Sequence, residues 1–206
     1  HDHDDHHHHD EGGHEHGSEL PAPLALLLML APLLFAIWYT VDDYSSSALI
    51  RKGLYADQAP QALLNSQKPP TFTLEQFKNS TPVSADGYYQ VQLIDLFFAS
   101  TDEELRAIFA TVPVEVIGQV ARQEGSAADE LRVYRLFITC CNADAQPISA
   151  RAKVEGADQW QDQQWVKLSG KVEFSLSEDG IPVPIFMADK IEAHQRPDDA
   201  WLNSGN

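Results

Sequence analysis

The chain has 206 residues, enough for one domain of ordinary size together with a membrane span and a linker. Its 14 basic and 31 acidic residues give a formal net charge of −17. Residues 81–206 carry 10 basic and 20 acidic side chains and no basic run, so they lack the clustered Lys and Arg with which proteins bind a phosphate backbone. We therefore expect no nucleic-acid partner.

The first 19 residues are rich in histidine and acid and are predicted to bind metal. Imidazole suits Zn, Cu and Ni, and carboxylates add oxygen ligands. The spacing favours no single set of four ligands, so several exchangeable sites are expected, with zinc or another divalent transition metal loosely bound. The interleaved acids argue against an expression tag, and a solvated acidic loop does not require eight imidazoles. The predicted ligands are His1, His3, His6, His7, His8, His9, His14, His16, Asp4 and Asp5.

An uncharged apolar segment follows, from Leu20 to Val41. It has 22 residues, and about 20 are enough to cross the hydrocarbon core as a helix. Trp38 and Tyr39 stand where an interfacial aromatic belt would lie. A buried core helix is disfavoured because no polar face is present, and a signal peptide because no basic residue precedes the segment. The sequence therefore predicts one transmembrane helix over residues 20–41.

Residues 42–82 show no sustained hydrophobic period and are predicted to be a linker. Part of this segment could form a short amphipathic helix that lies on the membrane or packs on the following domain.

Residues 83–206 are predicted to form a mainly β domain. Gly118 and Gly170 fall inside strand patterns and predict bulges or bends that curl the sheet. A helix is expected after an N-cap at Thr101. Curled short strands with one or two short helices indicate a small OB-like barrel, with a β-sandwich as the alternative. The predicted strands are Tyr88–Leu96, Val114–Val120, Tyr134–Cys140, Trp165–Phe174 and Ile185–Ala193.

A second candidate metal site is Cys140, Cys141 and Asp144, with a further ligand from elsewhere such as His194. Adjacent side chains of a strand point to opposite faces, so the two thiols can share one metal only across a bulge. The competing interpretation is structural: one cysteine packs in the core and Asp144 caps a turn. The structural interpretation is preferred.

The stretch Thr139–Pro147 (TCCNADAQP), with VEVIGQV before it and WVKLSGKV after it, resembles a family of bacterial predicted permease subunits. In that family, N-terminal spans and a His-rich loop precede a soluble C-terminal domain carrying a TCC-x-ADA-x-P stretch. The resemblance implies a two-gene system in which the partner is an integral membrane permease, with suspected metal-ion handling. It also implies an extracytoplasmic C-terminal domain, whereas Arg51 and Lys52 weakly favour the cytoplasm by the positive-inside rule. We follow the family topology.

The function predicted on this basis is a non-enzymatic, membrane-anchored accessory subunit of a permease, linked to zinc and located in the bacterial cell membrane. The alternative is a membrane-tethered OB-like module that binds an extracytoplasmic ligand or protein, with the His tract incidental. An enzyme using Cys140 or Cys141 as nucleophile has little support. No Ser/His/Asp or Cys/His motif is recognisable, and His194 is the only histidine after residue 16.

Overall fold

A computed structural model describes residues 21–38, 46–56, 73–123, 125–138, 144–177 and 180–203. The chain divides into two compact units, residues 1–44 and 45–206, which are treated separately.

The first unit contains the helix α1, Ala22–Trp38, within the predicted apolar segment. It carries no charged residue, and Pro32 lies inside it. Leu20 and residues 39–41, the ends of the predicted span, fall outside the described residues. Among the helices that the structure describes, none combines the length and the apolar character needed to cross a membrane.

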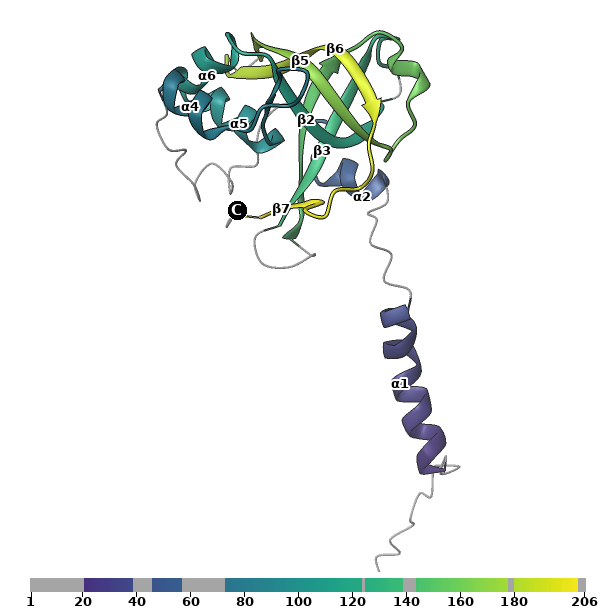
Figure 1. Cartoon of the computed structure of the whole chain (residues 1–206). Coiled ribbons are helices and arrows are strands. Elements are labelled where there is room, and N and C mark those ends of the chain that lie inside the picture. The colour runs from purple at the N-terminus through teal and green to yellow at the C-terminus, as the bar shows by residue number, and fades with distance from the viewer. Residues whose placement is uncertain are drawn as a thin grey trace, which may run out of the picture. The chain divides into compact units, whose positions relative to one another are not determined.

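The second unit is built on five strands that close into a barrel (Figure 1). Each strand pairs with two others, in the cyclic order β2-β5-β6-β4-β3 and back to β2. The pair β4–β6 is parallel, and the other four pairs of the ring are antiparallel. The strands are β2 Val114–Ala121, β3 Glu130–Ile138, β4 Gln146–Lys153, β5 Trp165–Leu176 and β6 Pro182–Ala193.

This closed, mainly β architecture is consistent with the predicted OB-like barrel and not with the alternative sandwich, which requires two separate sheets. Two short strands extend the sheet beyond the ring. β1, Tyr89–Gln90, pairs with β2, and β7, Trp201–Asn203, pairs with β3; both pairs are parallel.

The predicted bends at the two strand glycines are confirmed. At Gly170, the register between β5 and β6 shifts, as at a bulge. At Gly118, β2 turns from one partner to the other: it pairs with β5 as far as Gln119 and with β3 from Gln119 onward. A side chain at Gly118 would collide with the Val133 side chain and the Tyr134 carbonyl oxygen. Both glycines therefore permit the close approach of neighbouring strands on which closure depends.

Short helices pack against the barrel, in greater number than the one or two expected (Figure 1). α5 contacts β2, β4 and β6, and α6 contacts β5. The ring of Phe77 in α4 meets Phe109 at the end of α6 edge to face, with centroids 5.6 Å apart. The short helices are α2 Ser46–Arg51, α4 Leu74–Ser80, α5 Leu93–Thr101, α6 Glu103–Phe109 and the 3-10 turn η2 Ala157–Gln159.

Two local predictions are wrong. The expected strand Tyr88–Leu96 is a strand only at Tyr89–Gln90, and from Leu93 the chain is helical because α5 packs its apolar residues into the core. The expected N-cap at Thr101 is instead the next residue. Asp102 is extended, and its carboxylate accepts a hydrogen bond from the Leu105 backbone N–H at 2.9 Å. Asp is a strong N-cap residue for the same reason as Thr, so the sequence signal was displaced by one position.

Part of the predicted linker also has regular structure and belongs to the second unit. α2 and α4 lie within residues 42–82, and the unit begins at Ser45. α4 starts with a capping box in which Thr73 and Gln76 each bond the other's backbone N–H.

Candidate functional site

Most of the predicted metal ligands lie outside the described residues. This applies to the whole His tract, with Asp4 and Asp5, and to Cys140 and Cys141. Asp144 is described and lies just before β4, half-buried. Within the described part of the chain, no three His, Cys, Asp or Glu side chains come together as a metal site. Both metal sites therefore stay predictions.

His194, the suggested additional ligand, follows the end of β6. Its backbone N–H donates to the Trp165 carbonyl oxygen at 2.9 Å. Its ring Nδ1 lies 2.5 Å from the carbonyl oxygen of Gln195. These contacts tie the histidine to its own strand end and do not direct it toward other ligand-type side chains.

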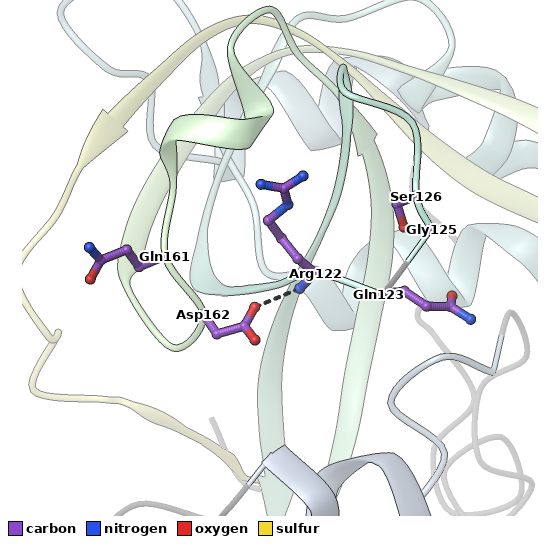
Figure 2. Close-up of a pocket in the computed structure, with 6 residues that line it drawn as sticks. All are labelled: Arg122, Gln123, Gly125, Ser126, Gln161 and Asp162. Atoms are coloured by element: carbon purple, nitrogen blue, oxygen red, sulfur yellow. Dashed lines mark hydrogen bonds between the residues drawn. The ribbon is translucent and has the colours of Figure 1, made fainter.

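A shallow, open depression of about 490 Å³ lies between two connections of the barrel (Figure 2). One is the β2–β3 connection and the other is the segment between η2 and β5. Asp162 Oδ1 accepts a hydrogen bond from the Arg122 backbone N–H at 2.7 Å, which joins the two connections. The lining residues are Arg122, Gln123, Gly125, Ser126, Gln161 and Asp162.

The chemistry of this depression is polar. Arg122 supplies a guanidinium, whose Nη1 donates to the Asp158 carbonyl oxygen at 3.1 Å, and Asp162 supplies a carboxylate. Figure 2 shows the Arg122 side chain extending into the space between the loops. The lining residues that the structure describes include no histidine or cysteine. The arrangement can contact a polar ligand through a guanidinium, a carboxylate and side-chain amides.

The outer face of β2, β5 and β6 carries a network of ion pairs centred on Glu115 and Lys167. Glu115 is buried, and its carboxylate lies 3.5 Å from Lys167 Nζ and 3.3 Å from Ser169 Oγ. Lys167 also pairs with Glu192 at 3.4 Å. Burial acts to lower the pKa of Lys167, but the two carboxylates outweigh it and hold that pKa above its ordinary value. This network compensates buried charge between adjacent strands, which is a structural role.

Asp95 is a titratable group with an abnormal pKa. Burial raises the pKa of its carboxyl to about 6, although the hydrogen bond from the Gln92 backbone N–H acts in the other direction. That bond, 2.9 Å long, is part of the capping box at the start of α5. Perturbed carboxyls often mark active sites. Here the capping box explains the position of Asp95, so it is not a catalytic candidate.

The raised pKa of Asp95 predicts how stability depends on pH. The folded state binds the proton more tightly than the unfolded state, so this group makes the free energy of unfolding fall as pH rises from about 4 to about 6. Asp95→Asn keeps an oxygen for the Gln92 N–H and removes the charge. We expect the variant to be more stable than the natural chain at pH 7.5, by on the order of 2 kcal/mol, and equal to it near pH 4. Urea unfolding at both pH values measures this, and equal stability at pH 7.5 would contradict it.

Comparison with known proteins gives a family and distant similarities to solved structures. No curated protein matches the chain. Among solved structures, yeast RPA bound to ssDNA matches with a TM-score of 0.25 and 11% identity. That match covers 42% of this chain and 66% of the other, just under two thirds of its length.

The family match is more extensive. The sequence model of the DUF1980 C-terminal domain matches residues 82–202, more than half of the chain. This range contains all five strands of the barrel and the helices α5 and α6. The chain therefore belongs to the DUF1980 C-terminal domain family.

Proposed function

We propose that this chain is a non-enzymatic, membrane-anchored accessory subunit of a permease, linked to a divalent metal ion and most directly to zinc. One observation carries the proposal: a His- and Asp-rich tract and an uncharged segment precede a DUF1980 barrel in a single polypeptide. The tract has the ligand chemistry to collect metal ions, and the uncharged segment Leu20–Val41 has the length of a span. The anchor would hold the tract at one surface of the bacterial cell membrane and the barrel at the outer surface.

The described surface of the barrel supports a docking role rather than a catalytic one. Its depression around Arg122 and Asp162 is open and polar, and the ion pairs around Glu115 have a structural role. A protein partner can be bound by such a surface without any reaction taking place on it. In this proposal that partner is the integral membrane permease implied by the TCCNADAQP stretch.

A second candidate is a membrane-tethered OB-like module that binds an extracytoplasmic ligand, with the His tract incidental. The depression in Figure 2 favours it, because OB-like barrels bind ligands with the loop between their first two strands, here the β2–β3 connection. An aromatic stacking groove has less support, since Trp160 packs against the core.

Affinity isolation of the full chain from detergent-solubilised membranes of its native host tests the proposal. We expect a multi-span permease to co-purify in comparable amount. Deleting residues 1–19 should leave this complex intact and alter the response of the cells to zinc. Replacing Arg122 by Ala removes the guanidinium from the depression and should lower the amount of permease that co-purifies, because this depression is the docking surface proposed above. Isolation of the chain without a permease would contradict the proposal.

A further inference from the structure

The outer face of β3 and β4 is buried although it points away from the barrel core. Val133 and Ala150 are register partners and belong to the core. The next pair, Tyr134 and Ser149, must point to the opposite face because strand side chains alternate. These two residues are only 2% and 4% exposed. A sheet face outside the core is buried in this way only when another part of the chain covers it.

Residues Ser46–Ala56, here called the strap, bind on this side of the barrel through three hydrogen bonds. Ser149 Oγ donates to the Leu54 carbonyl oxygen at 2.6 Å. Lys52 Nζ donates to the Ala145 carbonyl oxygen, just before β4, at 2.7 Å. Tyr55 OH donates to the carbonyl oxygen of Arg122, just after β2, at 2.8 Å. The strap therefore reaches both β4 and the end of β2.

The Tyr55 ring adds a further contact on the same face. The guanidinium of Arg132, a β3 residue, lies 5.7 Å from the centroid of this ring, within the range of a cation–π interaction. Burial raises the pKa of Tyr55, and Asp162 adds to the increase while Arg132 opposes it. The hydroxyl therefore stays protonated at neutral pH and keeps its role as donor.

The turn at the end of α2 places two leucines of the strap on the same, buried side. α2 ends in a Schellman motif: Leu54 N–H donates to the Leu49 carbonyl oxygen, and Gly53 N–H donates to that of Ile50, each at 3.1 Å. Gly53 has φ +90°, which a glycine adopts without strain. The motif brings Leu49 and Leu54 to one side, where each is 2% exposed, while Ile50 is 50% exposed. Both leucines are buried, yet neither belongs to the barrel's main core cluster.

We propose that the outer face of β3 and β4 is a peptide-binding surface and that the strap is its resident ligand. OB-like barrels bind oligonucleotides and oligosaccharides on the face of their second and third strands, which correspond to β3 and β4 here. In this chain the strap occupies that face. The surface therefore recognises an amphipathic peptide with two leucines five residues apart, a lysine ammonium and a tyrosine hydroxyl. The strap lies outside the matched residues 82–202.

The inference does not depend on the proposed function, and the full chain in mild detergent tests it. A protease site is inserted between residues 57 and 72, and an epitope is placed ahead of His1. After cleavage, the epitope is captured and the barrel fragment is quantified. Non-covalent docking of the strap predicts that most of the barrel is retained. Release of the barrel from the cleaved natural sequence would overturn the proposal.

Three variants test whether retention of the barrel fragment depends on the contacts of the strap. Leu49→Ala combined with Leu54→Ala removes both buried side chains and should raise the rate at which the barrel dissociates at least tenfold. Ile50→Ala is the matched control on the exposed side of the same helix and should retain the barrel as the natural chain does. Tyr55→Phe, a nearly isosteric change, removes one hydrogen bond and should raise the dissociation rate of the barrel about fivefold. Equal retention by the double-leucine and Ile50 variants would overturn the proposal, because retention would then not depend on the leucines.

Discussion

Replacing Gly170 with alanine is expected to destabilise the barrel more than any other single methyl addition considered. The added Cβ would stand 2.1 Å from the Met187 carbonyl oxygen and 2.9 Å from Ala188 Cα, and both belong to the backbone of β6. Backbone cannot rotate away as the end of a side chain can, so the two longest strands would have to separate at their bulge. We expect the free energy of unfolding to fall by about 3 kcal/mol or more, the upper end for overpacking.

Gly180→Ala is the matched control for this prediction. Gly180 has φ +74°, but no atom lies within 4 Å of the Cβ that alanine would add. Its cost is therefore limited to backbone strain, about 1 kcal/mol. Urea unfolding followed by tryptophan fluorescence gives both values. If the two variants lose the same stability, the close approach of β5 and β6 at Gly170 is not what holds the ring closed.

The parts of the fold that the sequence predicts well are those with a two-residue period and a glycine break. β2, β5 and β6 were expected within a few residues of their observed bounds, as were the bends at Gly118 and Gly170. These strands show the alternation clearly because one face contacts the core and the other is partly solvated. A glycine at a crowded position then marks where the sheet must curve.

β4, Gln146–Lys153, was missed, because its residues are weak strand formers. Most of its residues are buried although it has two faces, because the barrel core lies on one side and the strap on the other. Its sequence, QPISARAK, alternates apolar and polar residues from Ile148 to Lys153, but two of the three apolar residues there are alanines and Pro147 stands near its start, so the signal is weak. The outer face of β4 is buried by the strap, which contacts it from 95 positions away in the sequence. A local sequence pattern cannot show such a contact.

A short helix that packs on the domain was one of the alternatives for residues 42–82, but its position was not predicted, although a local signal for it exists. Arg51 and Lys52 precede Gly53, and a leucine follows it. Basic residues in a last helical turn, then glycine and an apolar residue, are the sequence pattern of a Schellman motif. The helix is only six residues long, too short for a hydrophobic period to be read from it. Its burial on the barrel is a tertiary contact and requires the structure.

Of the candidate functional features, one could be predicted from the sequence and one could not. The depression at Arg122 and Asp162 could not be predicted, because its residues are brought together from positions 40 apart by barrel closure. The His tract, in contrast, is evident from composition alone, since eight of its first 16 residues are histidine. The metal binding predicted for it depends on residue type and local density rather than on a folded cage.

Zinc binding to the full chain is the measurement that tests the account most directly. With about four ligands per zinc, the eight imidazoles and their neighbouring carboxylates predict about two or more ions per chain at pH 7.5. Ligand imidazoles must be deprotonated, and imidazole has an ordinary pKa of about 6.5, so most of this zinc should be lost at pH 5.5. A variant with all eight tract histidines changed to Gln should bind no zinc at pH 7.5. The variant Cys140→Ser combined with Cys141→Ser should bind as much zinc as the natural chain. Undiminished zinc binding by the histidine variant, or no zinc binding by the natural chain, would contradict the account.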